Sequence, residues 1–283
     1  MGELYLCPTP IGNLEDITLR TIRILKEVDI IAAEDTRHSL KLLQHLGINK
    51  PLTSYHEHNK YKKIDYIIEK LNSGNNIALV TDAGTPAISD PGEELVKKCI
   101  ELGINVVALP GATASITALI ISGFNTKGFI FEGFLPTDKK SRIKILERNK
   151  NEERTLIFYE APHRLIETLN IMLDNFGNRN IAVCKELTKL HEEVIRGTIE
   201  EVLEIFNSSD KIRGEFVLVL EGKSSELINE EKIKKFSEID INTHMMMYTS
   251  NGMSEKDAMK IVAKERGMKK REVYSILKGD QDE

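Results

Sequence analysis

The chain has 283 residues, of which 41% are hydrophobic and 29% are charged, and its formal net charge at pH 7 is −5. A chain of this length buries a sizeable core and has room for two domains, and the composition is that of a globular protein. The small net charge neither favours nor excludes an anionic partner. Any surface that binds nucleic acid must therefore be local.

The three cysteines, Cys7, Cys99 and Cys184, are far apart and form no Cys-x-x-Cys pair. This spacing indicates neither a zinc site nor a disulfide framework. No apolar run has the length needed to span a bilayer, and the N-terminus lacks the basic start and apolar segment of a signal peptide. We therefore expect no metal and no membrane association, with the reducing cytoplasm as the location.

In the first part of the chain, short apolar runs alternate with amphipathic stretches. The runs predict strands and the stretches predict helices. The strands are expected over residues 3–7, 29–33, 77–81 and 105–109, and the helices over residues 18–28, 61–72 and 93–102. Such alternation is typical of a parallel sheet covered by helices. We therefore predict an α/β domain over residues 1–117.

A glycine-rich region, residues 123–133, interrupts this alternation. Beyond it we expect strands over 154–159, 181–185 and 214–221, with helices near 163–173 and 198–206. These elements predict a second α/β domain over residues 118–222. The polar stretch 222–226 then leads into a segment with a helical pattern, which predicts a small helical domain over residues 223–283.

The last segment carries a local positive charge. Between residues 252 and 279, eight basic residues oppose four acidic ones, and three of the basic residues are consecutive: Lys269, Lys270 and Arg271. Two short helices separated by Gly267 are predicted here, with Ala258, Ile261, Val262, Val273, Tyr274 and Leu277 on their buried faces. Such a helix-turn-helix-like unit can place a basic face on phosphates, and a solvated helical surface explains the charges equally well.

Residues 82–92 contain two glycines and two prolines between a predicted strand and a predicted helix. A long, rigid loop in this position favours ligand binding over a structural connection. Residues 8–16 also follow a predicted strand, where open α/β sheets bind ligands, although a plain strand-to-helix turn would explain them too. Neither a Gly-x-Gly-x-x-Gly fingerprint nor a phosphate-binding loop occurs, which argues against nicotinamide and ATP.

Polar clusters end three of the predicted strands, at residues 34–37, 160–164 and 185–189. Asp35 could cap the next helix, and a proline at position 162 would place its polar neighbours near a helix N-terminus, where anions bind. Taken singly, each cluster is explained by a cap or an ion pair. Three such clusters at strand ends indicate a site, because the carboxyl ends of parallel strands share one edge of the sheet.

Together, seven motifs resemble the tetrapyrrole methylase superfamily, and within it the branch that methylates the ribose 2′-hydroxyl of a cytidine in 16S rRNA. The motifs are residues 8–16, 34–37, 82–92, 110–111, 132–136, 160–164 and 186–189. The match runs in order from Leu4 to about Gly222, and the terminal helices match more loosely. The resemblance implies an enzyme that uses S-adenosylmethionine, bound in a cleft between two α/β domains. It also implies a homodimer that acts on 16S rRNA of the small ribosomal subunit.

The resemblance also implies roles for individual residues. Cofactor contacts, chiefly through backbone groups in the central loop, are expected from Pro10, Ala83, Gly84, Thr85, Ile88, Thr113, Ala114, Glu160 and Leu187. Methyl transfer would be a direct in-line displacement assisted by a base. Candidate bases are Glu34, Asp35, Glu160, His163 and Glu186, with Glu160 or Asp35 as the first choice. Phosphate placement or charge stabilisation would come from Arg37, Arg164, Lys185 or Lys189, and RNA binding from Arg37, His163, Arg164, Lys269, Lys270 and Arg271.

Two other functions are compatible with the sequence. The first is methylation of a corrinoid or porphyrin by a member of the same superfamily, but those relatives usually carry Gly-Gly-Asp-Pro where this chain has residues 83–86, Ala-Gly-Thr-Pro. The second is a ribosome-assembly binding protein that keeps the fold without catalysis. The rigid loops on both sides of the expected cleft argue against this second function, because a binding protein without a cofactor has no need of them.

Overall fold

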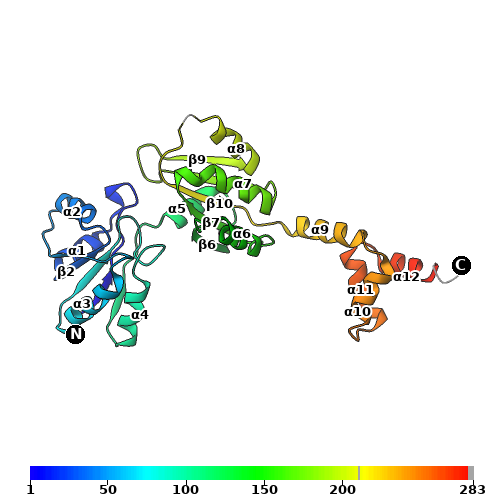
Figure 1. The fold of residues 1–283 in the computed structure, drawn as a ribbon, viewed down its shortest axis with the longest axis horizontal. Coiled ribbons are helices and arrows are strands. Elements are labelled where there is room, and N and C mark those ends of the chain that lie inside the picture. Colours follow the sequence, from blue (N-terminus) through cyan, green and yellow to red (C-terminus); the bar gives the residue numbers. More distant parts are fainter. Residues whose placement is uncertain (210, 280–283) are drawn as a thin grey trace. The chain divides into compact units, whose positions relative to one another are not determined.

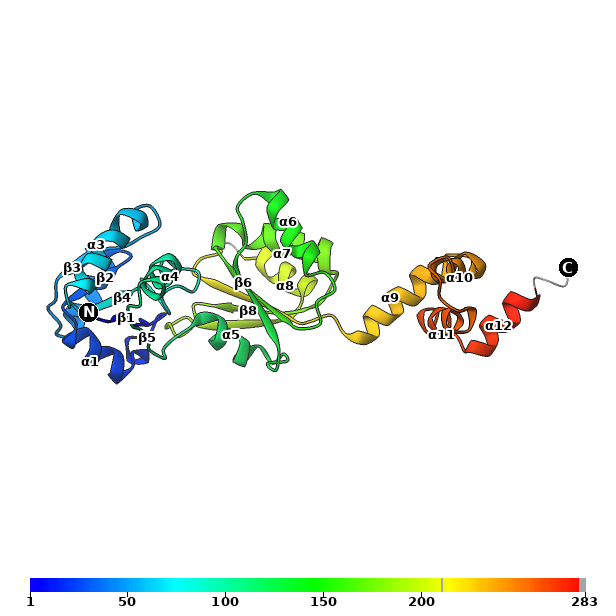
Figure 2. The ribbon, with the colours of Figure 1, turned by 90° about the horizontal axis from the view of Figure 1, so that it is seen from below.

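The structure is a computed structural model and describes residues 1–209 and 211–279. The chain forms two compact units (Figures 1 and 2). The first combines residues 1–147 with residues 155–221, and the second combines residues 148–154 with the chain from residue 222 onward. The first unit contains two sheets, and the second is helical.

The first sheet is parallel throughout, as the alternation of strands and helices predicts. Its strand order is β3-β2-β4-β1-β5, and the strands are β1 (Leu4–Leu6), β2 (Ile30–Ala33), β3 (Leu52–Ser54), β4 (Ile77–Val80) and β5 (Val106–Ala108). Every residue of the central strand β4 is buried. This explains why it reads as a continuous apolar run rather than an alternating one.

Helices cover both faces of this sheet, and an apolar core lies on each face. The helices are η1 (Leu14–Asp16), α1 (Leu19–Glu27), α2 (Thr36–His45), α3 (Lys60–Asn72) and α4 (Glu93–Glu101). One core joins Leu25 and Leu43 to Ile31, and the other joins Ile67 and Leu95 to Leu79. Because both faces are covered, only the ends of the strands remain open for a ligand.

The second sheet has the order β6-β7-β10-β8-β9, with β6 and β7 parallel and the other neighbours antiparallel. The strands are β6 (Phe129–Phe134), β7 (Thr155–Glu160), β8 (Asn180–Lys185), β9 (Glu193–Thr198) and β10 (Phe216–Leu220). Part of the glycine-rich region is thus strand β6. Its register shifts between Phe131 and Gly133, where Gly133 has a φ of 67°.

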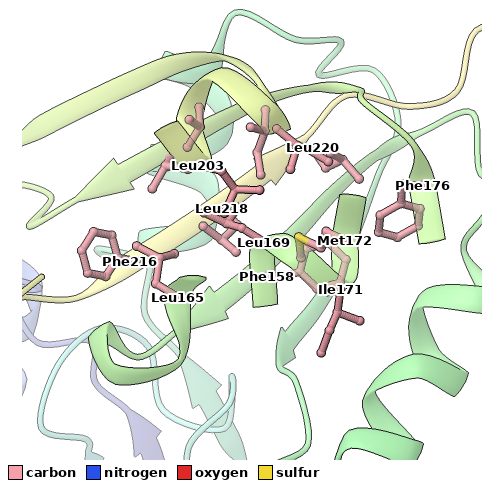
Figure 3. Close-up of a cluster of buried hydrophobic side chains, with 14 of the residues drawn as sticks. Phe158, Leu165, Leu169, Ile171, Met172, Phe176, Leu203, Phe216, Leu218 and Leu220 are labelled. Atoms are coloured by element: carbon pink, nitrogen blue, oxygen red, sulfur yellow. The ribbon is translucent and has the colours of Figure 1, made fainter. Parts of the chain in front are cut away.

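Helices also flank the second sheet. They are α5 (Ala114–Ser122), α6 (Lys139–Arg148), η2 (Pro162–Arg164), α7 (Leu165–Phe176) and α8 (Ile199–Asn207). The largest core lies between the sheet and the helices α7 and α8, where Leu169 and Leu203 meet Phe158 and Leu218 (Figure 3). On the other face, Leu119 of α5 joins a cluster with the strand residues. The predicted fold class, two α/β parts followed by a helical unit, is confirmed.

The second unit consists of α9 (Ser225–Ser237), α10 (Ile241–Thr249), α11 (Glu255–Glu265) and α12 (Lys270–Gly279). The predicted pair of helices around Gly267 is confirmed as α11 and α12, and Gly267 has a φ of 62°. Val262 and Val273 lie in the core of this helical unit, as predicted. Tyr274 is 49% exposed, so the prediction that it is buried is wrong. Within the described ranges, no helix is long and apolar enough to cross a membrane.

Candidate functional site

The loop over residues 82–92 joins β4 to α4, as the sequence predicts. Its backbone is strained, because Ala87 and Ser89 have positive φ values of 67° and 62°. Residues other than glycine rarely adopt this conformation, and such strain is typical of functional loops. At Gly92, where φ is 153°, a Cβ atom would lie 2.9 Å from the Cβ of Ala87. The loop is therefore tightly folded on itself.

A neighbouring loop braces this strained segment. The backbone N–H of Thr9 donates to the carbonyl of Gly84 at 2.9 Å, and the N–H of Gly84 donates back to the carbonyl of Thr9 at 3.1 Å. The hydroxyl of Thr9 also donates to the carbonyl of Thr81 at 3.1 Å. Both backbone polar groups of Gly84 are therefore used to hold the two loops together. The N–H of Gly84 is not left over to bind a ligand.

A cavity of about 380 Å³ opens beside these loops, within the first unit. Its volume is in the range of small-molecule binding sites. Residues from both sheets and their loops line it: Ile11, Glu34, Asp82, Ala83, Gly84, Thr85, Ile88, Ser89, Asp90, Thr113, Ala114, Phe134, Tyr159, Glu160, Ala161, Pro162, Leu187, Gly214, Glu215, Phe216 and Val217. The expected cofactor residues all line it except Pro10, whose neighbour Ile11 does so instead.

Three carboxylates gather on one wall of the cavity: Glu34 follows β2, and Asp82 and Asp90 lie near the two ends of the loop between β4 and α4. The hydroxyl of Thr81 donates to Oε2 of Glu34 at 2.8 Å, and Oδ1 of Asp82 accepts the backbone N–H of Asp35 at 3.1 Å. Partial burial and the nearby charge of Glu34 raise the pKa of Asp90 to about 7. None of the described residues that line the cavity is a lysine or an arginine, so the cavity suits a cationic ligand better than an anionic one.

Apolar side chains form another part of the cavity wall. Ile11, Leu187 and Val217 belong to one cluster beneath it. The phenolic oxygen of Tyr159 accepts the backbone N–H of Ser115 at 3.1 Å and so holds the first turn of α5. A planar aromatic ligand group would meet apolar atoms here, and the charged part of the same ligand would meet the carboxylates.

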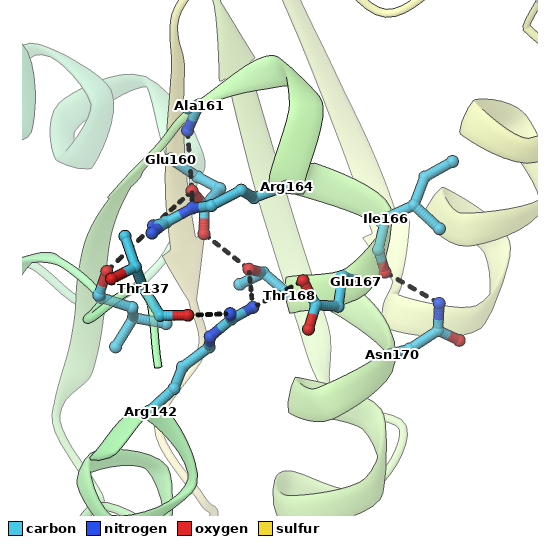
Figure 4. Close-up of polar contacts among 10 residues, drawn as sticks. Thr137, Arg142, Glu160, Ala161, Arg164, Ile166, Glu167, Thr168 and Asn170 are labelled. Carbon is cyan, nitrogen blue, oxygen red and sulfur yellow. Dashed lines mark hydrogen bonds and ion pairs between the residues drawn. The ribbon is translucent and has the colours of Figure 1, made fainter. Parts of the chain in front are cut away.

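Glu160 lines the cavity but its carboxylate is saturated with partners (Figure 4). Oε1 accepts the backbone N–H of Ala161 and Nε of Arg164, both at 2.8 Å, and Oε2 accepts the hydroxyl of Thr168 at 2.6 Å. The side chain of Glu160 is fully buried. Arg164 also donates from Nη2 to the carbonyl of Leu135 at 2.9 Å. This geometry favours a positioning role for both residues.

Asp35 adopts the capping role that the sequence left open. Its Oδ1 accepts the backbone N–H of Arg37 at 2.8 Å at the start of α2, and its Oδ2 pairs with Nη2 of Arg37 at 2.7 Å. The hydrogen bonds from Arg37 hold the pKa of Asp35 well below its usual range. Neither residue lines the cavity. A base must take up a proton at the reacting atom, and this pair does not meet that requirement.

Of the cluster at residues 185–189, Leu187 lines the cavity and its four neighbours do not. Oε1 of Glu186 accepts Nζ of Lys189 and the backbone N–H of Glu215, both at 2.9 Å. The hydrogen bond from Lys189 lowers the pKa of Glu186. Lys185 pairs with Glu193 at 3.3 Å. These residues hold the loop that carries Leu187.

The remaining predicted residues lie outside the cavity lining. His163 is exposed on η2, and Lys269, Lys270 and Arg271 lie at the start of α12 in the second unit. Among the residues that the structure describes, no group of three or more His, Cys, Asp or Glu side chains is placed to hold a metal ion. All three cysteines are buried, and burial raises the pKa of the Cys7 thiol to about 12.

Sequence reasoning missed Asp82 and Asp90 as site residues. Both lie in the loop over residues 82–92, which was identified from its glycines and prolines alone. The missing signal was the position of these carboxylates at the two ends of the loop, since a strand end and a helix start meet at the same edge of the sheet. Glu34 comes close to these carboxylates because β2 and β4 are neighbours in the sheet, and the sequence does not reveal this strand order.

Comparison with known proteins agrees with this geometry. The family of tetrapyrrole (corrin/porphyrin) methylases matches residues 3–203. The chain is 54% identical over 274 residues to the ribosomal RNA small subunit methyltransferase I of Bacillus subtilis (strain 168), covering 97% of this chain and 93% of that protein. Proteins of the same name from Synechocystis and Haemophilus influenzae are 46% and 50% identical, over 98% and 81% of this chain and 97% and 82% of their own lengths. The chain therefore belongs to the tetrapyrrole methylase family, and the predicted resemblance is confirmed.

Proposed function

We propose that the protein is an S-adenosylmethionine-dependent methyltransferase that methylates the ribose 2′-hydroxyl of a cytidine in 16S rRNA of the small ribosomal subunit. Three relatives with at least 46% identity are named ribosomal RNA small subunit methyltransferase I, and the similarity includes the terminal helices. The observation that carries the proposal is the cavity, which joins a carboxylate wall to an apolar wall at the carboxyl ends of parallel strands.

The lining residues fit S-adenosylmethionine in charge and shape. This cofactor has a sulfonium cation and an ammonium group. Glu34 and Asp82 supply negative charge, Asp90 adds to it when deprotonated, and none of the described lining residues is a lysine or an arginine. The apolar wall with Leu187 and Val217 suits an adenine ring. The proposed contacts are Ala83, Thr85, Ile88, Thr113, Ala114 and Leu187, with Gly84, Glu160 and Pro10 shaping or bracing the wall.

When bound, the cofactor would supply an activated methyl group for direct in-line transfer to the ribose oxygen. The strained loop and its brace from Thr9 would hold the wall rigid, so that the reacting groups stay aligned. We assign the base to Asp90, assisted by Glu34. A carboxyl with a pKa of about 7 accepts a proton effectively near neutral pH. Glu160 and Asp35 would position the site, because their carboxylates are already occupied.

Further parts of the chain would contribute to recognition of the RNA. We propose that residues 1–117 and 118–222 form the two domains beside the cavity and that residues 223–283 bind RNA through Lys269, Lys270 and Arg271. The side chain of Arg37 is 88% exposed and could contact phosphate while it remains paired with Asp35. The protein would act as a homodimer in the cytoplasm, where ribosomal subunits assemble.

Transfer of a radiolabelled methyl group tests the proposal. Small ribosomal subunits that lack the modification and a tetrapyrrole precursor are incubated in parallel with the protein and labelled S-adenosylmethionine. Label in an alkali-resistant dinucleotide of 16S rRNA is expected, because 2′-O-methylation blocks alkaline cleavage. Label in the tetrapyrrole alone would instead indicate a corrinoid or porphyrin methylase. Label in neither, with intact binding to subunits, would indicate a non-catalytic assembly protein.

A pair of variants tests the assignment of the base. Asp90→Asn should lower kcat about 10²- to 10⁴-fold, which is the usual contribution of a general base. Asp174→Asn is the matched control, since Asp174 is an exposed carboxylate on α7 outside the cavity lining. Equal activity of the two variants would contradict the role of Asp90.

A further inference from the structure

Helix α6 carries more net positive charge than any other helix in the described part of the chain. Its ten residues include five basic ones and a single acidic one, Glu147. Lys139, Lys140 and Lys144 are exposed, and none of them forms an ion pair with another described residue. We call these three side chains the α6 lysine row. Arg142, by contrast, is turned inward and is only 2% exposed.

The α6 lysine row is locally unfavourable for the helix. Lys139 and Lys140 lie in the first turn, where the unpaired N–H groups already create positive potential. Lys140 and Lys144 are four residues apart and repel each other on one face. Asp138 offsets part of this charge, and its Oδ1 caps the helix by accepting the N–H of Ser141 at 2.8 Å. An anion bound along the row would relieve both repulsions.

A rigid network joins α6 to the wall of the cavity (Figure 4). Arg142 donates from Nη2 to the carbonyl of Thr137 at 3.1 Å and from Nη1 to the hydroxyl of Thr168 at 3.4 Å. That hydroxyl donates in turn to Glu160, which lines the cavity. Arg142 also pairs with Glu167 at 3.2 Å. The first turns of α6 are therefore fixed with respect to the cavity.

An exposed aromatic ring at the cavity comes shortly before the α6 lysine row in the sequence. Phe134 ends β6, lines the cavity and is 57% exposed. Its ring makes an edge contact with Tyr159 at a centroid distance of 5.4 Å, which holds its orientation. Lys139 follows five residues later, so its backbone lies within about 18 Å of Phe134 even if the connection were fully extended.

We propose that Phe134 and the α6 lysine row form an RNA-binding strip at the rim of the cavity. Phe134 would stack on a base next to the reacting nucleotide, and the lysines would bind the sugar-phosphate backbone of the same strand. Aromatic faces and lysine charges are the usual means of holding unpaired RNA. The inference rests on the proposed function, because it assumes that the ligand at the rim is rRNA.

Neutral substitution of the row tests the phosphate contacts. The Lys139→Gln, Lys140→Gln, Lys144→Gln variant of the full chain is compared with wild type for binding to small ribosomal subunits between 50 and 300 mM KCl. Loss of three contacts should lower the slope of log K against log salt by about 2 and raise Kd about 100-fold at 0.1 M salt. The affinity for S-adenosylmethionine should not change.

A second triple variant serves as the control. Lys26→Gln, Lys41→Gln, Lys62→Gln removes the same charge from exposed lysines around the first sheet. It should retain wild-type Kd and salt slope. If the α6 variant binds as wild type does, or if both variants lose the same affinity, the assignment of phosphate contacts to this row is overturned.

Phe134→Leu tests the stacking contact while keeping an apolar wall. It should weaken binding to the subunits about 10- to 100-fold, and Phe129→Leu, at the other end of β6, should not. Equal binding by the two variants would overturn the role of Phe134. If wild type methylates 16S rRNA but none of these variants loses affinity, the strip fails and the proposed function stands. If wild type neither binds subunits nor methylates their RNA, both fail.

Discussion

Asp90→Asn should change how the stability of the protein depends on pH. In the folded protein the pKa of Asp90 is about 7, compared with an ordinary value of 3.8. The fold thus favours the neutral carboxyl. The stability that follows from this preference is fully present below pH 4 and is lost as the pH rises through 7. An asparagine side chain stays neutral at every pH and removes this dependence.

The size of the effect follows from the difference between the two pKa values. For a fully buried group, that difference would amount to about 4 kcal/mol of unfolding free energy. Asp90 is half-buried, so solvent screens its interactions with Glu34 and Asp82, and we expect about 1 to 2 kcal/mol. Between pH 5 and 8, the unfolding free energy of wild type should fall by most of this amount relative to that of the variant.

Urea unfolding followed by far-ultraviolet circular dichroism at several pH values measures this difference. Asp35→Asn is a suitable control, because the depressed pKa of Asp35 places its titration in the folded protein below this pH range. Its pH slope should therefore match that of wild type, apart from a constant loss from the missing cap. If Asp90→Asn also keeps the wild-type slope between pH 5 and 8, the reasoning about the carboxylate wall is refuted.

Two further predictions concern the support of the site, and a third concerns the basic residues of the second unit. Thr168→Val removes the 2.6 Å hydrogen bond to buried Glu160 and should cost about 1 to 3 kcal/mol in thermal unfolding, whereas Thr168→Ser should restore most of it. Gly92→Ala should weaken binding of S-adenosylmethionine by calorimetry, because its Cβ would clash within the loop, and Gly103→Ala, with open space around it, should bind normally. Charge reversal of residues 269–271 should weaken binding to ribosomal subunits and reduce its salt dependence without changing cofactor affinity, and an unchanged salt slope would argue against this patch.

The sequence predicts the central strands of the first sheet well because they are buried on both faces. Residues 77–81 form an apolar run of the expected length, and β4 occupies nearly the same positions. Shorter or more polar elements escaped prediction. Strand β3 has three residues, and α2 begins with the polar sequence Thr36-Arg37-His38-Ser39, which shows no clear apolar periodicity.

The candidate site was predictable in its loops but not in its chemistry. Glycines and prolines mark residues 82–92 regardless of their partners. The role of Asp90, however, depends on Glu34, which is far away in sequence and comes close only because β2 and β4 are neighbours. The carboxylate of Glu160 is satisfied by Thr168 from the following helix, and this contact likewise follows from the packing of α7 on the sheet.

The error at Tyr274 has a similar origin. Periodicity placed it on the buried face of α12 beside Val273, yet adjacent residues of a helix are separated by about 100° and do not share a narrow face. Val273 is fully buried and Tyr274 is half exposed, with Nζ of Lys278 5.3 Å from the centre of its ring. A small helical unit covers only one stripe of each helix, so the width of that stripe determines which residues are buried.

The carboxylate wall also bears on product release. Negative side chains attract a ligand most strongly while it carries positive charge, and methyl transfer converts a sulfonium into a neutral thioether. Glu34, Asp82 and Asp90 would therefore bind the spent cofactor less tightly than the fresh one. Under the proposed function, the loss of charge in the reaction would itself promote exchange of product for substrate, without a moving element to expel it.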